Sequence, residues 1–299
     1  MTGITTDEPV GTMTSTPTPV VRRRRRRRRR TGSNILALVV SVIWIFPVYW
    51  MVLTSFKQPW NVLNATPEFL PRDPSLQNYV NALTQTTFFT NLKNSVIVVA
   101  LTLIFAIVLA MFASAALSRF RFRGRRLILV LILAVQMLPG TALLIPQFLV
   151  FNQLGLLNHY IGLILAYVAL TLPFSIWVMR GFFLAIPREI EEAAQVDGAN
   201  TWTIMWRVLF PLVAPGVIAS SVFSFIAAWN DYLVAYVFMK DQTMYTLPVW
   251  LASFAVPNQP IDYAAQMAAS VIFSLPAVIF FLIIQRNLVT GMSAGAVKG

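Results

Sequence analysis

Hydrophobic residues along the chain fall into six long blocks separated by polar or charged segments. Each block is close to the roughly 20 residues that an α-helix needs to cross about 30 Å of hydrocarbon. No block carries a lysine or arginine in its middle, and short segments of strict two-residue alternation are absent. The pattern predicts an all-α polytopic membrane protein with six transmembrane helices at residues 35–56, 92–118, 127–152, 160–180, 211–238 and 266–285.

The charges between the blocks predict the orientation of these helices. If the N-terminus lies inside the cell, 19 of the 23 basic residues fall in inside segments and four in outside segments. Without the arginine run at residues 22–30, the bias is still ten to four. Basic residues in short loops favour the cytoplasmic side, so we expect both termini to be inside.

The composition excludes an ordinary soluble enzyme. Hydrophobic residues make up 57% of the chain and charged residues only 11%, against roughly 25% charged residues in soluble domains. The mean hydropathy is +0.69. There is no cysteine and only one histidine, His159, which excludes disulfides, thiolate metal sites and multi-histidine metal sites.

Residues 1–33 are rich in threonine and proline and then in arginine, so they predict a disordered cytoplasmic tail. The run Arg22–Arg30 could bind nucleic acid or anionic lipid by releasing counterions. Because the first apolar block follows almost directly, we favour a role in fixing topology beside membrane lipid, and expect no nucleic-acid partner. Residues 57–91 form the longest outside segment, which could contact an external partner or simply cap the helices.

Residues 186–211, between the fourth and fifth blocks, are too polar for the membrane and hold four of the eleven carboxylates. Pro187 suits a first helical turn, and Gly198 suits the position just after a helix. Asn200 or Thr201 can then cap a second short helix. We expect that helix to present one face of four residues, and Pro211 to open the fifth span; the four are Trp202, Met205, Trp206 and Leu209. The segment could lie on lipid as an amphipathic linker or dock on a protein.

The spacing within this segment resembles the EAA loop of ABC importer permeases. Glu192-Ala193-Ala194 is followed by three residues, Gly198, nine residues and then Val208-Leu209-Phe210-Pro211. The stretch 192–199 resembles the carbohydrate-type, MalG-like permeases, whose fold is the MetI-like type I importer fold. The same family is indicated by Asn94-Ser95, by Arg119-Phe120-Arg121-Phe122-Arg123-Gly124, by Trp229-Asn230-Asp231 and by the C-terminal residues 294–299, and the likeness covers roughly residues 35–299. We expect residues 34–299 to form the transmembrane permease domain.

The resemblance implies a coupling helix that sits in a cleft of a cytoplasmic ATPase subunit. It assigns the ATPase contacts to the residues matching the motif, which are Glu192, Ala193, Ala194, Asp197, Gly198 and Pro211. It also implies a C-terminal tail that reaches the ATPase through Ala294, Gly295 and Lys298. Such permeases work as heterodimers on an ATPase dimer, and an extracytoplasmic solute-binding protein delivers the substrate.

Polar and aromatic side chains within the spans are candidates for a translocation path. Hydroxyl-directed hydrogen bonds and aromatic faces suit a sugar substrate. The candidates are Gln136, Asn152, Tyr167, Trp229, Asn230 and Asp231, although each could instead join helices by hydrogen bonds. Asp231 is the acidic residue within a span, and we expect it to hydrogen-bond near Asn230; a proton-coupled carrier would use such a residue as its relay.

Two further patterns bear on catalysis. Gly291-Met292-Ser293-Ala294-Gly295 matches the nucleophile elbow, but it follows a membrane helix and lacks a histidine on its side of the bilayer. No phosphate-binding loop with the G-x-x-x-x-G-K-[ST] pattern occurs, so ATP is expected to be bound by a partner subunit. The sequence predicts a non-enzymatic permease without its own cofactor or metal, in the bacterial cytoplasmic membrane, that carries a sugar. The alternatives are a solute such as a glycerol phosphodiester, or an autonomous ion-coupled carrier.

Overall fold

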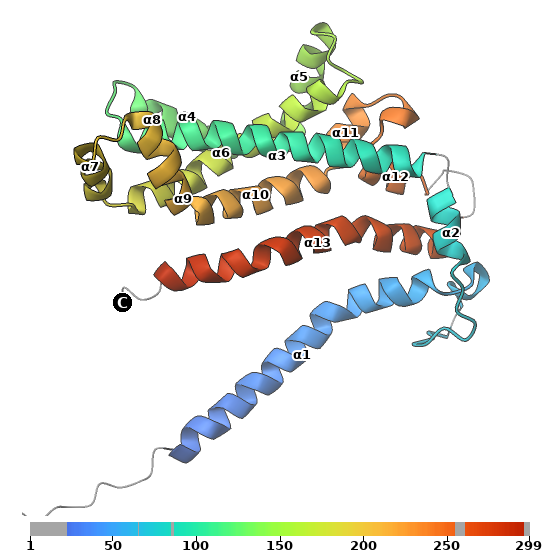
Figure 1. Cartoon of the computed structure of the whole chain (residues 1–299). Coiled ribbons are helices and arrows are strands. Elements are labelled where there is room, and N and C mark those ends of the chain that lie inside the picture. Colours follow the sequence, from blue (N-terminus) through green and yellow to red (C-terminus); the bar gives the residue numbers. More distant parts are fainter. Residues whose placement is uncertain (1–22, 65, 85–86, 255–260, 296–299) are drawn as a thin grey trace, which may run out of the picture. The chain divides into compact units, whose positions relative to one another are not determined.

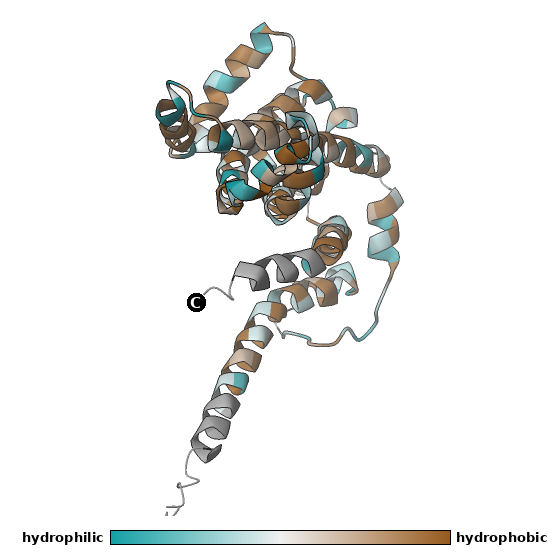
Figure 2. Cartoon of the chain, turned by 60° about the vertical axis from the view of Figure 1, so that its left-hand side comes forward, coloured by the Kyte–Doolittle hydropathy of each residue, from teal (hydrophilic) through white to brown (hydrophobic). Residues whose placement is uncertain are grey.

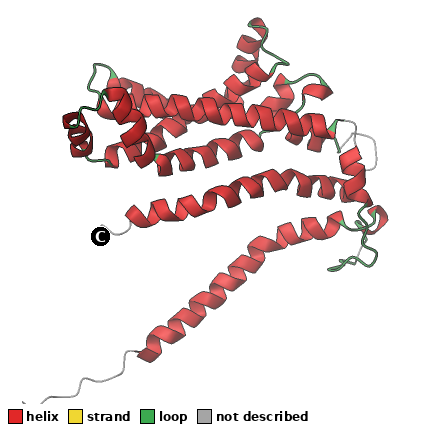
Figure 3. Ribbon diagram, in the orientation of Figure 1, coloured by secondary structure: helices red, strands yellow, loops and turns green. Residues whose placement is uncertain are grey.

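The computed structural model describes residues 23–64, 66–84, 87–254 and 261–295, with side chains over 32–285 of these ranges. Its regular structure over these ranges is helical throughout (Figure 3). The longer helices are α1 (Arg23–Ser55), α3 (Phe88–Arg119), α4 (Arg125–Gln136), α5 (Gly140–Gln153), α6 (Tyr160–Ala185), α10 (Ala214–Trp229) and α13 (Tyr263–Gly295). The shorter ones are α2 (Gln77–Thr84), α7 (Arg188–Val196), α8 (Thr201–Thr203), α9 (Phe210–Leu212), α11 (Leu233–Phe238) and α12 (Leu247–Ala252).

The chain divides into two compact units, residues 1–50 and residues 51–299. The first unit contains most of α1, whose helical structure begins at Arg23 and so includes arginines that the composition assigned to a disordered tail. Residues 1–22 of that tail lie outside the described residues. The second unit holds the remaining helices and all of the features discussed below (Figure 1).

Four helical segments are long and apolar enough to cross a membrane by themselves, and they confirm four of the six predicted spans. These segments are Gly32–Ser55, Phe88–Arg119, Tyr160–Ala185 and Tyr263–Gln285. Two bent helix pairs bring the number to six if each pair counts as one span. Apolar residues dominate the long helices in Figure 2.

The third predicted span, 127–152, is broken where we expected a continuous helix. Helix α4 ends at Gln136, α5 begins at Gly140, and the two helices are bent by 102°. Pro139 occupies the position before α5 with φ −65° and ψ 123°. Proline lacks an N–H group and pushes the residue before it out of the helical region, so the helix stops at the Leu138-Pro139 step.

The fifth predicted span, 211–238, is also interrupted. The stretch Thr201–Leu212 meets Ala214–Trp229 at 70°, so Pro211 lies in α9 before the bend and the long helix opens at Ala214. This helix then ends at Trp229, and a separate helix, α11, begins at Leu233. The first break occurs where Pro215 favours the start of a new helix. The second occurs at residues 230–232, which are not helical, so three segments replace the straight span.

The core of the second unit is formed by α3, α6 and α10, which pack against one another. Small residues allow the close approach; Ala106 and Ala110 on α3 and Ala166 on α6 are buried. Some polar groups inside this bundle bond to each other, as where the hydroxyl oxygens of Ser175 and Ser224 lie 3.3 Å apart, whereas the buried hydroxyl groups of Thr102 and Ser220 have no hydrogen-bond partner among the described residues. Small residues and short hydroxyl side chains are the usual contacts between membrane helices.

The end of this bundle near residue 88 carries structure that the hydropathy pattern did not predict. The segment 57–91, expected to be an external loop or cap, includes α2 and a 3₁₀ turn at Pro59–Asn61. The side-chain amide of Asn78 on α2 donates to the carbonyl oxygens of Ser55 and Lys57, each at 2.8 Å. The short helix α12 also lies at this end and packs on α3.

Candidate functional site

The polar segment 186–211 folds as two short helices joined by a tight turn, as the sequence predicted. Helix α7 follows Pro187 and has Glu189 and Glu191 in its first turn, where carboxylates complement the helix dipole. Gly198 lies just after this helix with φ +84°. That left-handed conformation is strained for most side chains, so glycine is the residue that sets the turn.

Asn200 caps the second short helix, because its Oδ1 accepts a hydrogen bond from the Thr203 amide at 2.8 Å. The predicted single face of this helix is wrong in part. Residues Ile204–Leu209 form a π-helical turn, which widens the helix and shifts the positions of later side chains. Leu209 is buried, whereas Trp202 is 64% exposed and stacks on Phe112 of α3.

The surface of α7 is open at the residues of the motif. Glu192, Ala193, Asp197 and Gly198 are exposed, and Ala194 is half-buried against the hydrophobic cluster at this end of the bundle. Pro211 is also exposed, but it lies in α9, which follows the Gly198 turn in the chain, whereas α7 precedes that turn. The motif therefore presents small and acidic side chains outward from one short helix.

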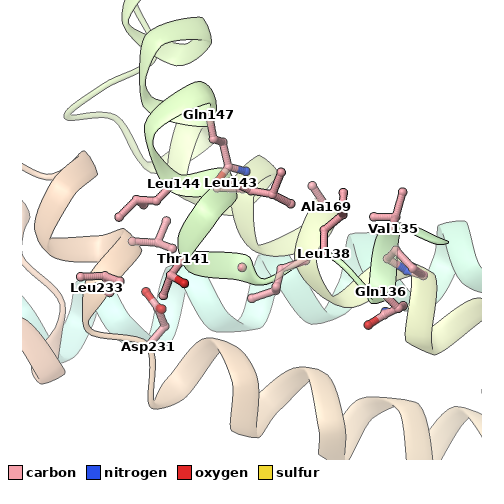
Figure 4. A pocket seen from close by; sticks show the side chains of 15 residues that line it. Val135, Gln136, Leu138, Thr141, Leu143, Leu144, Gln147, Ala169, Asp231 and Leu233 are labelled. Atoms are coloured by element: carbon pink, nitrogen blue, oxygen red, sulfur yellow. The ribbon is translucent and has the colours of Figure 1, made fainter. Parts of the chain in front are cut away.

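A pocket of about 550 Å³ lies beside the break between α4 and α5 and the break between α10 and α11. It is bounded by the end of α4, the start of α5, the middle of α6 and the start of α11, and most of its lining is apolar. Its polar lining residues are Gln136, Thr141, Gln147 and Asp231. In the view of Figure 4, Asp231 and Thr141 lie at one end of the pocket and Gln136 at the other. Concave apolar pockets of this size with a few polar groups are typical of small-molecule sites.

Asp231 is held in place by α6 and α11. Its Oδ2 accepts a hydrogen bond from the hydroxyl of Tyr167 at 2.9 Å and from the amide of Ala235 at 3.1 Å. The expected bond near Asn230 is not the one that forms, because the Asn230 side chain turns back and donates to the Ile226 carbonyl at 2.9 Å. The carboxylate thus has a fixed partner across two helices.

The comparisons with known proteins decide the family. Residues 106–294 match the family described as "Binding-protein-dependent transport system inner membrane component". The chain belongs to this family. It is therefore a transport permease of the inner membrane, and the matched range includes α7, the Gly198 turn and the pocket.

The permease resembles curated relatives over most of its length. It is 38% identical over 266 residues to the diacetylchitobiose uptake system permease protein DasC of Streptomyces coelicolor, covering 89% of this chain and 96% of the relative. It is 35% identical over 265 residues to the trehalose/maltose transport system permease protein MalG of Thermococcus litoralis, covering 88% and 95%.

Among solved structures, the permease is similar to a chain of a bacterial ABC transporter involved in the import of the acidic polysaccharide alginate. The TM-score is 0.77 and the identity 25%, and the match covers 91% of this chain and 99% of the other. The MetI-like permease fold expected from the sequence is confirmed by the family match and this structural similarity.

The candidate translocation residues divide into three groups. Gln136 and Asp231 line the pocket, and Tyr167 stands behind Asp231, buried and bonded to it. Asn152 and Asn230 are exposed and lie outside the pocket lining. Trp229 is buried between the rings of Phe225 and Phe273 and packs the core.

Sequence reasoning missed Thr141 and Gln147, which line the pocket from α5. The step Leu138-Pro139-Gly140 could have found them, because a proline-glycine break in an apolar block exposes the polar side chains that follow it. Of the predicted tail contacts, Ala294 and Gly295 belong to the α13 backbone but their side chains are not described, and Lys298 lies outside the described residues.

Proposed function

We propose that this permease is the transmembrane subunit of an ATP-driven importer that carries a mono- or oligosaccharide across the bacterial cytoplasmic membrane. The observation that carries the proposal is the joint occurrence of saccharide-uptake permeases among its relatives and a pocket whose polar groups suit hydroxyl ligands. Carboxamide, hydroxyl and carboxylate groups can each accept or donate hydrogen bonds to sugar hydroxyls.

The pocket lining favours a sugar over a phosphodiester. Its polar residues include one carboxyl group, and no lysine, arginine or histidine is among the described residues that line it. A phosphodiester carries a negative charge, which a low-dielectric pocket holds well only beside a cation. A neutral polyhydroxyl solute meets no such penalty.

The energy source in this proposal is a pair of cytoplasmic ATPase subunits that bind ATP and contact the exposed face of α7. Glu192 supplies a polar contact, Ala193 and Ala194 allow close approach, and Gly198 sets the angle of the helix that follows. The chain itself performs no covalent chemistry and needs no cofactor of its own. A second permease subunit completes the pathway, and a solute-binding protein delivers the sugar from outside.

The mechanism is a shift between two packed states. Nucleotide binding changes which state the ATPase pair prefers, and a coupling helix passes that preference to the membrane helices. In one state the central cavity opens outward, and in the other it opens inward. This mechanism requires no proton transfer, and in it Asp231, which accepts a hydrogen bond from Tyr167, acts as a fixed hydrogen-bonding group.

The proposal is tested in proteoliposomes that contain this permease with its partner permease, ATPase and binding protein. Uptake of labelled diacetylchitobiose, trehalose, maltose and a glycerol phosphodiester is measured with and without ATP, with the pH gradient set to zero. A parallel set of liposomes that hold this chain alone is measured with and without a pH gradient. We expect ATP-dependent uptake of at least one saccharide and none by this chain alone. Uptake by the chain alone, driven by a pH gradient, would establish an ion-coupled carrier instead. ATP-dependent uptake of the phosphodiester alone would overturn the sugar assignment.

A further inference from the structure

Arg119, the last residue of α3, reaches across to the loop that contains α7. Its Nε lies 2.6 Å from Glu191 Oε1, and its Nη2 donates to the carbonyl oxygen of Ile186 at 3.1 Å. The two side chains of the ion pair are only 10% and 17% exposed. One guanidinium group therefore contacts both the residues just before α7, at Ile186, and the first turn of α7, at Glu191.

Glu191 and its neighbour Glu192 face different environments. Successive residues of an α-helix point about 100° apart, and here Glu191 turns toward Arg119 while Glu192 is exposed. The motif resemblance assigns the ATPase contact to Glu192 and gives no role to Glu191. Helix α7 thus has an outward face for a partner and an inward face that is fastened to α3.

We propose that the Arg119–Glu191 ion pair is the link through which movement of α7 is passed to α3, with Arg119 as the positioning residue. This inference rests on the proposed function, in which an ATPase moves α7. Helix α3 packs along α6 and α10, and α6 carries Tyr167 behind the pocket. A pull on Arg119 therefore acts on the end of α3, which is one of the three helices that form the core of the bundle.

The geometry of the pair suits transmission of force. Two contacts from one planar guanidinium fix both the position and the rotation of α7, which a single point contact cannot do. The shielded setting also weakens salt screening relative to an exposed pair. The contrast is the pair Arg72–Glu68 in segment 57–91, whose arginine side chain is 81% exposed.

Loss of the pair should leave the permease folded, because apolar contacts also hold this loop. Ile204 and Leu209 are buried in a hydrophobic cluster with Met179 and Phe183 of α6, and Ala194 of α7 packs against that cluster. The ion pair adds a directional connection to a loop that already has an apolar anchor. Its removal is therefore a test of coupling more than of folding.

The first experiment is a double-mutant cycle in the reconstituted importer, with sugar transported per ATP hydrolysed as the readout. We expect Arg119→Gln and Glu191→Gln each to lower this ratio at least fivefold, with ATP hydrolysis continuing. The double variant should have a ratio no lower than that of the more impaired single variant, because both changes break the same link. Arg119→Lys should fall between wild type and Arg119→Gln. Glu189→Gln, on the same helical turn but exposed, is the matched control and should keep the wild-type ratio.

The second experiment uses the absence of cysteine from this chain. Arg119→Cys combined with Glu191→Cys is assembled with cysteine-free partner subunits and treated with a short bis-maleimide, whose two double bonds each take up one thiol. We expect the untreated variant to be uncoupled and the cross-linked variant to recover at least half of the wild-type ratio. The same reagent on either single-cysteine variant should restore nothing.

The outcomes separate this inference from the proposed function. The link would be overturned if both single glutamine variants kept the wild-type ratio of sugar transported per ATP hydrolysed. It would also be overturned if the fold-loss in the double variant equalled the product of the two single fold-losses. Failure of the cross-link to restore coupling in a folded, assembled complex would also overturn it. If the wild-type complex itself shows no ATP-dependent sugar uptake, the proposed function fails first.

Discussion

The two ends of α3 hold their neighbouring loops in different ways. Near its N-terminal end, Asn94 is buried and donates through Nδ2 to the carbonyl oxygens of Thr243 and Tyr245, each at 2.8 Å. Its Oδ1 accepts from the Tyr160 hydroxyl at 2.6 Å. At its C-terminal end, roughly 37 Å away along the helix axis, Arg119 provides the ion pair with Glu191 and one carbonyl contact.

The N-terminal end is also fixed by a second group of hydrogen bonds. Asn158, between α5 and α6, accepts from the amides of Lys240 and Asp241 and donates to the Asp241 carboxylate at 2.6 Å. Ser95 accepts from the Leu247 amide at 2.7 Å. These bonds join the segment 239–247 to helix α3 and to the turn between α5 and α6.

The difference indicates that the two ends of α3 have different roles. The densely bonded end gives the bundle a fixed frame, and the sparsely bonded end carries an exposed helix, a glycine turn and a π-helical segment. Apolar contacts are non-directional and oppose a shift of one element past another less than hydrogen bonds of fixed geometry do. We therefore expect changes at the first end to alter stability and changes at the second to alter coupling.

The largest effect on stability is expected from Gly162→Ala at the densely bonded end. A Cβ at this position would overlap the backbone carbonyl oxygen of Leu156, so the α5–α6 turn that carries Asn158 must shift. We expect thermal unfolding in detergent to show a loss near the upper end of roughly 1–3 kcal/mol. Gly181→Ala is the control on the same helix, since a Cβ there meets no atom within 4 Å. Equal behaviour of the two variants would contradict the fixed frame.

The second largest effect is expected from Asn94→Leu, which keeps the branched shape of the side chain and removes its hydrogen-bonding groups. It leaves the Tyr160 hydroxyl and two carbonyl oxygens without their partner, at a cost of roughly 1–3 kcal/mol. Hydrogen exchange should become faster in residues 239–247 and stay unchanged in 186–211. Asn81→Leu, at an exposed position of α2, serves as control. Faster exchange in residues 186–211 alone, which we call the coupling loop, would reverse our comparison.

At the sparsely bonded end, Gly198→Val should leave the bundle folded and reduce transport. A Cβ there meets no atom within 4 Å, but the φ of +84° strains a β-branched side chain by about 1–2 kcal/mol. We expect sugar uptake to fall at least tenfold while ATP hydrolysis continues. Gly198→Asn is the control, since asparagine tolerates the left-handed region. Wild-type uptake by Gly198→Val would show that the angle of this turn does not matter.

The sequence predicted the fold class, four of the spans and the Gly198 turn because each depends on local signals. Long apolar blocks, a proline before α7 and a glycine after it act within a few residues. The broken spans were missed because a hydropathy window averages over Pro139 and over residues 230–232. It gives the length of an apolar segment and does not show whether the helix axis bends within it. The π-helical turn is likewise invisible to a 3.6-residue pattern, which placed Leu209 on one face with Trp202 although Leu209 is buried and Trp202 is exposed.

The candidate site was less predictable because its bonds join distant residues. Asp231 was found as an acidic residue in an apolar block, but its partner Tyr167 lies 64 positions away. Arg119 was interpreted as a basic residue that orients the chain and as part of the family-like segment 119–124, and its pairing with Glu191 needs the tertiary structure. Spacing can identify the face of a helix that meets an unknown partner, whereas contacts inside the fold require coordinates.

The smallest effect is expected from Asn200→Ala, which removes the cap of the second short helix. The Asn200 side chain makes one hydrogen bond, to the Thr203 amide at 2.8 Å, and loss of such a cap costs about 1 kcal/mol. Exchange at the Thr203 amide should become faster, and uptake should fall by less than in Gly198→Val, because the turn itself is unchanged. Asn200→Ser keeps a capping oxygen and should resemble wild type. If Asn200→Ala lowers global stability as much as Asn94→Leu does, then this end is fastened as firmly as the other, and the proposed division between frame and coupling loop is wrong.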